Sequence, residues 1–367
     1  MDSASRYLSL EDPKKADHLW RYTPWKRVHP TGDVAEIPSL GEPEIGLSMI
    51  DGSDLPSGIA VKRGIVEDLD FSMSNALTNS FLHATAKSSQ WTLVVDRGFS
   101  SKKPIVLDIE TGDLPCTAHI SLDIGKMSEF EMITRVTGRS EWFGLLRTGE
   151  IRDEAVVNDV VIGLLERGTM LRSDSIDICR NAQVRVGTVS SGSERTKSDL
   201  RYKMGEPGGN IRVLGSILSV DSMHLDHHIE IHHEAPETFS RLSWHSACGG
   251  SSRTIGTGML TIREGSKGAD AAQIFRNLLL SEKAEADSIP ELEVMENDVV
   301  GCGHGTANGP IDEEQMYYLK ARGFDEDDAK RSLIAAFLNS TLSEMGGSDL
   351  HEWLVSELTL QLEAHDA

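Results

Sequence analysis

The feature that most constrains this chain is a long region of short, strand-like runs. From Ser89 to Val294 such runs follow one another, among them WTLVVD, NAQVRVGTV and RTIGTGMLTI. Within DLRYKMGE, Leu200, Tyr202 and Met204 alternate with charged residues, which is the two-residue period of a strand. Gly, Asn, Asp and Ser separate the runs, and no helical period interrupts them. The region predicts a mainly β fold: a sandwich, a barrel, a propeller (weakened by the lack of a crisp repeat) or an irregular β-solenoid.

The segments on either side of this region have other patterns. Residues 1–75 combine Trp20, Trp25 and several prolines with weak periodicity, which is typical of short helices and loops. Within them, the Pro-, Gly- and Ser-rich stretch Ile37–Gly58 predicts a connector without a packed core of its own. The chain is therefore divided into an N-terminal helical region with its linker, a β core and a C-terminal helical domain, over residues 1–75, 76–300 and 301–367.

The C-terminal segment has the period of α-helices. Asp312 is placed to cap the first of them, with acidic residues in its first turn, and Gly323 is placed to end it. The three expected helices cover residues 312–322, 325–345 and about 349 onward. The second helix has an apolar stripe composed of Ala329, Leu333, Phe337 and Thr341, and the third has one composed of Leu350, Leu354, Leu358 and Leu362.

Charge and cysteine content exclude several classes of protein. The chain carries 58 Asp and Glu against 36 Lys and Arg, a formal net charge of −22, which disfavours nucleic acid binding. No apolar run is long enough for a membrane span, and the N-terminus lacks the apolar core of a secretory signal. The four cysteines lie far apart and form no CxxC motif, so we expect neither a zinc knuckle nor a disulfide framework. The expected compartment is the cytoplasm.

The densest chemical pattern is MHLDHHIEIHHE, Met223–Glu234. In a strand, its even positions form one face, composed of His224, Asp226, His228, Glu230, His232 and Glu234. Side chains two residues apart on such a face are about 7 Å apart, so His228 and His232 are candidate metal ligands with the carboxylate between them. A metal-dependent hydrolase is one hypothesis, and a solvated, histidine-rich strand face without metal is the other.

A second candidate site is GCGHGTANGP, Gly301–Pro310, which is expected to be a glycine-rich loop. Cys302 and His304 lie two residues apart in it, and such a thiolate and imidazole suit iron, zinc or transient sulfur acceptance. The alternative is a turn that closes the β region and buries a structural cysteine. GxxxxGK followed by Ser or Thr is absent, so any ATP must be handled by another protein. A serine nucleophile is not indicated, since GxSxG is absent too.

Four stretches resemble the SufB/SufD family of iron–sulfur cluster assembly proteins. DHHIEIHHEAPETFS, from Asp226 to Ser240, resembles the family signature D-x6-H-x2-P-x-T-x-S. KGADAAQIFRNLLLSEKAEADSIPELEV is similar to the last β turns of the family, and HGTANGPIDEEQMYYLKARGF to the block that follows them. WRYT, which begins at Trp20, is similar to the N-terminal motif of the SufD branch. Several linked motifs in one order make a coincidence improbable.

The resemblance implies a right-handed parallel β-helix flanked by helical N- and C-terminal domains. It also implies a non-enzymatic role, in which the protein is part of the scaffold on which an iron–sulfur cluster is assembled. The C-terminal domain of the family binds SufC, an ABC-type ATPase, and a SufB paralogue or a second copy of the chain completes the dimer. Carried over to this sequence, the SufC docking surface consists of Gln315, Met316, Tyr317, Tyr318, Leu319, Arg322 and Gly323.

Two departures favour the SufD branch over SufB. The SufB branch has a sulfur-accepting cysteine where this chain has Phe275, and a glutamate after the terminal-loop histidine where this chain has Gly305. The Cys-x-His-Gly arrangement of SufD is matched by Cys302, His304 and Gly305. By resemblance, His304 is the first candidate ligand for transient iron or a transient iron–sulfur cluster, and Cys302 is the second.

Overall fold

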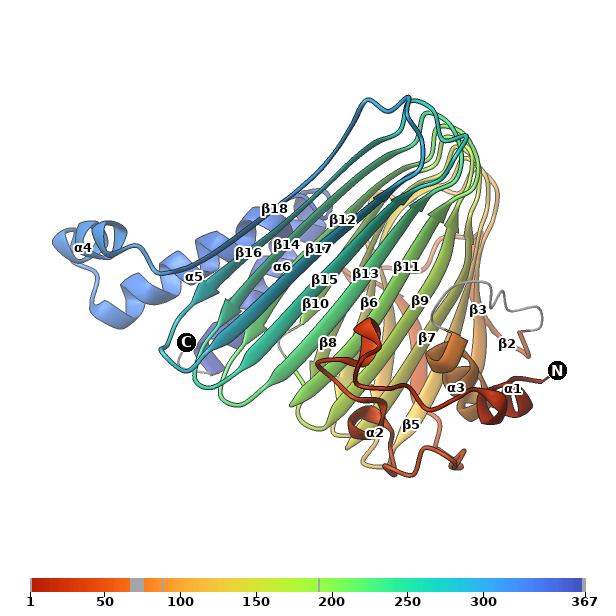
Figure 1. Ribbon diagram of the computed structural model, residues 1–367, viewed down its shortest axis with the longest axis horizontal. Helices are drawn as coiled ribbons and strands as arrows, with labels where there is room; N and C mark the ends of the chain where they lie inside the picture. The colour runs from red at the N-terminus through yellow and green to blue at the C-terminus, as the bar shows by residue number, and fades with distance from the viewer. Residues whose placement is uncertain (1, 67–75, 88, 191, 365–367) are drawn as a thin grey trace.

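In the computed structural model, the chain forms a parallel β-solenoid of about eight turns with helices at its ends (Figure 1). The structure describes residues 2–66, 76–87, 89–190 and 192–364. Each turn contributes one strand to each of two nine-stranded sheets, so odd-numbered and even-numbered strands from β3 onward lie in different sheets. The mainly β fold with terminal helices is therefore confirmed, and among the expected β architectures it is the solenoid.

The two sheets, A and B, contain regular strands in chain order. Sheet A contains β2 (Ile59–Arg63), β3 (Gln90–Val95), β5 (Cys116–Ile124), β7 (Trp142–Ile151), β9 (Thr169–Ile178), β11 (Arg195–Met204), β13 (His224–His233), β15 (Arg253–Ile262) and β17 (Glu285–Val294). Sheet B contains β1 (Glu44–Met49), β4 (Ile105–Thr111), β6 (Glu129–Gly138), β8 (Val156–Leu165), β10 (Gln183–Ser190), β12 (Asn210–Ser219), β14 (Phe239–Cys248), β16 (Asp270–Leu279) and β18 (Gly301–Pro310). Among the described strands, β1 pairs antiparallel with β4 and β2 pairs antiparallel with β3, whereas the other strand pairs are parallel.

The solenoid turns lengthen along the chain. Gln183 of β10 pairs with Val156 of β8, 27 residues earlier, whereas Gly301 of β18 pairs with Asp270 of β16, 31 residues earlier. From β11 to β18 every strand has ten residues, while the offset between paired strands grows from 29 residues for β11 and β13 to 32 for β15 and β17, so the added residues lie in the connecting turns. A repeat of drifting length explains why the sequence shows no crisp period.

The core lies between the two sheets, in the lumen of the solenoid. On β13, Leu225, Ile229 and Ile231 belong to this core, which places the odd-numbered positions of the strand inward. The even-numbered positions, His228 and Glu230 among them, therefore lie on the outer face of sheet A, since successive side chains of a strand alternate. As expected from the sequence, the even and odd positions of the histidine-rich strand lie on opposite faces of the sheet.

The N-terminal elements pack against the outside of sheet A, in front of the strands in Figure 1. They are α1 (Ser3–Ser9), a 3-10 turn (His18–Trp20), α2 (Trp25–Val28) and α3 (Ala76–Ala86). Trp25 and Phe81 pack edge to face with ring centroids 5.1 Å apart. The connector expected over Ile37–Gly58 is corrected: it contains β1, which pairs with β4 and buries Met49 in the core. The predicted boundary at residue 75 falls within 67–75, outside the described residues.

The C-terminal helices are α4 (Glu313–Ala321), α5 (Glu326–Leu342) and α6 (Ser348–Ala364). The cap predicted at Asp312 is observed, and so are the buried leucines of α6: Leu350, Leu354, Leu358 and Leu362. Asp325 caps α5 in the same way. The stripe expected on α5 is partly wrong. Leu333 and Phe337 are only half-buried, whereas Ile334 and Leu338 face the outside of sheet B.

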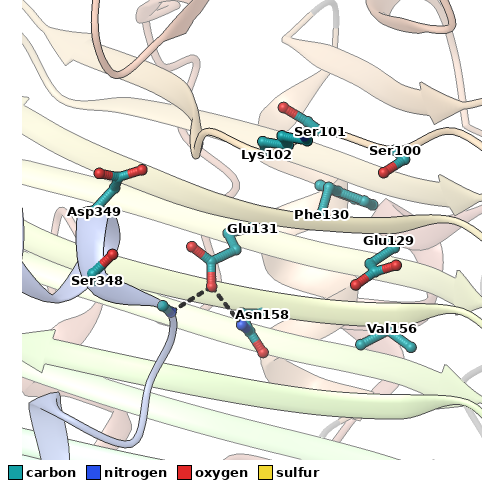
Figure 2. A pocket seen from close by; sticks show the side chains of 11 residues that line it. Ser100, Ser101, Lys102, Glu129, Phe130, Glu131, Val156, Asn158, Ser348 and Asp349 are labelled. Carbon is teal, nitrogen blue, oxygen red and sulfur yellow. Dashed lines mark hydrogen bonds between the residues drawn. The ribbon is translucent and has the colours of Figure 1, made fainter.

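The side chain of Glu131 in sheet B forms a hydrogen bond with the backbone of the turn between α5 and α6. Glu131 on β6 accepts hydrogen bonds at Oε1 from the Gly347 N–H (2.6 Å) and the Asn158 side chain (2.7 Å), as Figure 2 shows. Lys103 forms a second link, an ion pair of 2.8 Å with Asp349 at the start of α6. Both contacts fasten the helical region to the solenoid, and Glu131, Asn158 and Gly347 line a pocket beside them. Among the described residues, no helix combines the length and the apolar character needed to span a membrane.

Candidate functional site

The last solenoid turn, β17 and β18, is built differently from the turns before it. In the described part of the chain, β18 pairs only with β16 and β17 only with β15, so each strand is the edge of its sheet. Neither β17 nor β18 has a buried residue. The loop expected over Gly301–Pro310 is wrong, because this segment is strand β18. Its glycine-rich sequence has low strand propensity, but β16 supplies a complete row of backbone partners.

Cys302 and His304 lie on the lumen side of this edge strand. Cys302 is opposite Ala271 and His304 is opposite Gln273, both of which are inward-facing positions of β16. Cys302 is half-buried and packs against the core, whereas His304 is exposed. Burial raises the pKa of the Cys302 thiol above its ordinary value, and the nearby charge of Asp270 raises it further. The thiol therefore stays protonated near neutral pH unless a cation stabilises the thiolate.

Phe275 fills the lumen beneath this turn. It is almost fully buried on β16, directly opposite Thr306 of β18. A Cβ atom added at Gly256 would lie 2.8 Å from the Phe275 ring, and one at Gly258 would lie 2.1 Å from Oε1 of Gln273. The two glycines of β15 are therefore needed to make room for Phe275 and Gln273.

Cys302 and His304 alone would not complete a metal site. A thiolate and an imidazole suit zinc or iron, but a four-coordinate site needs two more ligands. In residues 2–66, 76–87, 89–190 and 192–364, no third His, Cys, Asp or Glu donor joins these two within a distance that one ion could share.

The outer face of β13 carries a charged network. Nε2 of His228 lies 2.7 Å from Oε1 of Glu230, Nε2 of His232 lies 3.1 Å from Oε2, and Arg201 on β11 forms an ion pair with the same carboxylate. Burial would raise the pKa of Glu230, but the two histidine contacts and the charge of Arg201 hold it well below its ordinary value. Both imidazoles thus face a carboxylate that is already paired with a cation. Their role as metal ligands stays a prediction, and the hydrolase hypothesis gains no support here.

The signature of the resemblance has a structural role in this chain. His233, fully buried, lies 2.8 Å from Oγ1 of Thr238 through Nδ1 and 2.8 Å from Oγ of Ser240 through Nε2, so it fastens the turn between β13 and β14. Asp226 accepts hydrogen bonds from Thr23 (2.6 Å) and Lys197 (3.1 Å), so it ties the N-terminal segment to sheet A. The sequence identified these residues as a motif but did not reveal these contacts.

A second cluster, which sequence reasoning missed, lies inside the lumen. Arg147 on β7 forms ion pairs with Asp159 of β8 and, at 3.2 Å, with Asp174 of β9. Arg172 lies 2.6 Å from Asp174, whose carboxylate also accepts a hydrogen bond of 3.2 Å from the Tyr202 hydroxyl. All five side chains are buried. A signal was present: Arg172 and Asp174 share a strand face with the apolar Met170 and Ile176.

The residues predicted to bind SufC lie together on α4 and the turn after it. Figure 1 shows α4 standing away from the sheets, and no residue of α4 is buried. Tyr317 is 75% exposed and Tyr318 is 55% exposed, while the Arg322 guanidinium lies 4.9 Å from the centre of the Tyr318 ring. Gly323 has a φ of 98° and follows the end of the helix, as predicted.

Comparison with known proteins identifies the family. Residues 109–337 match the family described as the SUF system FeS cluster assembly SufBD core domain. An iron–sulfur cluster assembly SufBD family protein of Mycobacterium leprae is 25% identical over 371 residues, covering 96% of this chain and 91% of the relative. The SufD protein of Escherichia coli is 21% identical over 95% of this chain and 89% of its own length. The SufD protein of Bacillus subtilis is 37% identical over 112 residues, which cover 30% of this chain and 25% of the relative.

The match to the family covers more than half of the chain and contains β13, the lumen cluster and the last solenoid turn. The two SufD relatives agree with the branch that Phe275 and Gly305 indicate. The chain belongs to the SufBD family of iron–sulfur cluster assembly proteins.

Proposed function

We propose that this chain is a non-enzymatic scaffold component of the Suf system in the cytoplasm. Iron or an iron–sulfur cluster, its transient cargo, is held at the open end of the solenoid by His304 and Cys302. The solenoid has the right-handed parallel form of the family. One observation carries the proposal: both side chains lie on an edge strand, paired on one side only, that leads directly into the exposed helix α4.

A partner chain supplies the remaining ligands. Edge strands present unpaired backbone N–H and C=O groups, which favour pairing with another chain. In this protein β17 and β18 end the two sheets side by side, and Cys302 and His304 lie on the lumen side of that edge. A SufB paralogue or a second copy of this chain, joined edge to edge, would bring its own ligands to the same place.

A SufC-like ATPase docks on α4 and the turn that follows it. The exposed aromatic side chains of α4 suit a protein interface, where tyrosine and arginine are enriched. Movement of α4 can reach the solenoid, because α5 packs on β12 and β14 of sheet B. The His245 ring on β14 stacks on Phe337 of α5 with centroids 4.8 Å apart, and its Nδ1 lies 2.9 Å from Oγ of Ser340. ATP-driven closure of the ATPase would thereby shift the open end of the solenoid.

Anaerobic co-expression with the host's SufC-like ATPase tests the docking. Size-exclusion chromatography with light scattering should give a complex of two ATPases and two scaffold chains. Its mass with and without a SufB paralogue distinguishes a heterodimer from a homodimer. The double replacement of Tyr317 and Tyr318 by alanine should abolish co-elution, while Leu8→Ala, an exposed apolar control, should not. Co-elution of the double variant at the wild-type level would contradict docking on α4.

Cluster assembly in that complex tests the ligand role. His304→Ala should reduce the cluster formed per complex at least about tenfold, in line with the loss of a metal ligand. Thr306→Ala is the matched control, because Thr306 is exposed on the same face of β18. Equal cluster content in the His304 variant and the Thr306 variant would contradict the ligand role while leaving the docking result intact.

A further inference from the structure

Three metal-binding side chains meet at the edge of the solenoid formed by the turns that follow the sheet A strands. Asp153 lies in the turn after β7, Cys179 directly follows β9, and Glu206 lies in the turn after β11. Each offers one ligand atom, and the three atoms all lie within 4.8 Å of one another. In the part of the chain that the structure describes, this is the one group of three such donors.

Stacked turns hold the three donors in place. The backbone N–H of Cys179 donates to the carbonyl of Ile151 one turn below, at 3.0 Å. The Glu154 N–H donates to Arg180 at 2.9 Å, and the Asn181 N–H donates to Pro207 at 3.1 Å. These bonds join the three turns directly, so the spacing of the donors depends on the solenoid ladder rather than on a flexible loop.

The surroundings of the sulfur are rich in carboxylates. Burial raises the pKa of the half-buried Cys179 thiol to about 12, and the charges of Glu150, Glu206 and Asp153 contribute. Both of the proposed carboxylate ligands, Asp153 and Glu206, also face cations. Lys126 lies 2.7 Å from Oδ2 of Asp153, and Arg180 lies 3.7 Å from Glu206. An ionised carboxylate has two oxygens and about four lone-pair sites, so such an ion pair is compatible with metal coordination.

We propose that Asp153, Cys179 and Glu206 bind a thiophilic divalent cation of the zinc or ferrous iron type. One thiolate and two carboxylates bring three negative charges and a soft donor, a set that favours zinc or iron over magnesium or calcium. Ligand bonds of 2.0 to 2.3 Å place the donors of a tetrahedral site about 3.5 Å apart, so the donor atoms, which lie within 4.8 Å of one another, need to approach by at most about 1.3 Å. Glu206 is exposed, which leaves room for water as a fourth ligand. This site is independent of the proposed function, since Cys302 and His304 do not belong to it.

Cobalt(II) is the probe, because thiolate ligation gives it a charge-transfer absorption that carboxylates do not produce. Titration of the reduced full-length chain under anaerobic conditions should give this band at one equivalent, and Zn²⁺ but not excess Mg²⁺ should displace it. Cys179→Ser should abolish the band, and Cys248→Ser, a control at a buried cysteine with no proposed ligand role, should retain it. Asp153→Asn and Glu206→Gln, which keep the side-chain shape, should each weaken Co²⁺ binding at least tenfold.

A second measurement separates binding from misfolding. Zn²⁺ should raise the Tm of the wild-type chain and leave that of Glu206→Gln unchanged, while both proteins keep the same Tm without metal. A wild-type chain that shows no band would overturn the proposal. A band that persists in Cys179→Ser, which would place the cobalt at another thiol, would also overturn it. So would Zn²⁺ stabilisation that Glu206→Gln retains.

Discussion

Polar side chains face the lumen at two places, the middle of the solenoid and its open end, and their surroundings differ. In the middle, Arg147, Arg172 and Asp174 are buried on two adjacent strands, and both arginines form ion pairs with Asp174. At the open end, Cys302 is half-buried and His304 is exposed. The same strand face therefore carries a sealed ionic cluster at one level and accessible ligand atoms at another.

The difference follows from what covers each level. A turn in the middle is covered above and below by neighbouring strands, so a charge there must find its partner inside the protein. The last turn is covered on one side only, by β15 and β16. Its polar groups therefore stay accessible to solvent and need no partner within the chain. Position along the solenoid, rather than residue type alone, decides whether a polar residue stabilises the fold or binds a ligand.

The largest expected effect comes from breaking the sealed cluster. Asp174→Asn removes the carboxylate shared by Arg147 and Arg172, and so leaves a buried guanidinium without adequate compensation. We expect the free energy of unfolding to fall by about 3–5 kcal/mol, measured by urea denaturation at pH 7. Glu166→Gln, which breaks an exposed pair with Arg139, should cost about 0.5 kcal/mol or less. Equal losses in the two variants would remove the distinction between buried and exposed charge.

Features set by nearby residues could be predicted from the sequence. The cap at Asp312 is an example: its Oδ1 accepts a hydrogen bond of 2.8 Å from the N–H of Glu314, two residues on. The alternation in β11 is another, since Leu200, Tyr202 and Met204 are all buried. Both signals lie within a few residues, so the sequence reveals them without the fold.

Features that depend on the stacking of turns could not be predicted. Arg147 and Asp174 are 27 residues apart, and their contact exists only because β7 and β9 are adjacent strands. The strand Gly301–Pro310 has the composition of a loop and becomes a strand because β16 offers it a partner. The sequence does not predict a site at Cys179, because the nearby Asp153 and Glu206 lie in other turns. In each case the missing information is which residues of successive turns lie opposite each other. The sequence does not reveal this register, because the number of residues per turn varies along the chain.

The second prediction concerns pH and tests the sealed part of the lumen through His233. Burial lowers the pKa of this histidine to about 4. Below its unfolded pKa of about 6.5, the unfolded chain binds a proton that the folded chain does not bind, so stability falls as the pH decreases towards 4. The contribution of His233 amounts to about 1.4 kcal/mol per pH unit in that interval.

His233→Gln should remove this part of the pH dependence. Urea denaturation at pH 7.5, 6.0 and 5.0 should show that the loss of stability between pH 6 and pH 5 is smaller in the variant by about 1 kcal/mol. The variant is also expected to be less stable at pH 7.5, because the ring contacts with Thr238 and Ser240 are disturbed. Parallel pH curves for the two proteins would show that folding does not shift the pKa of His233.

The smallest expected effect is at the open end. Among the described residues the His304 ring makes no hydrogen bond or ion pair, and its side chain is exposed, so His304→Ala has little to remove from the folded state. We expect the free energy of unfolding of the isolated chain to change by about 0.5 kcal/mol or less, as for Thr306→Ala. A loss above about 1 kcal/mol would mean that His304 contributes to packing as the lumen residues do. The open end would then no longer differ from the buried lumen cluster in its effect on stability. Reduced cluster assembly in this variant could also be attributed to instability rather than to a lost ligand.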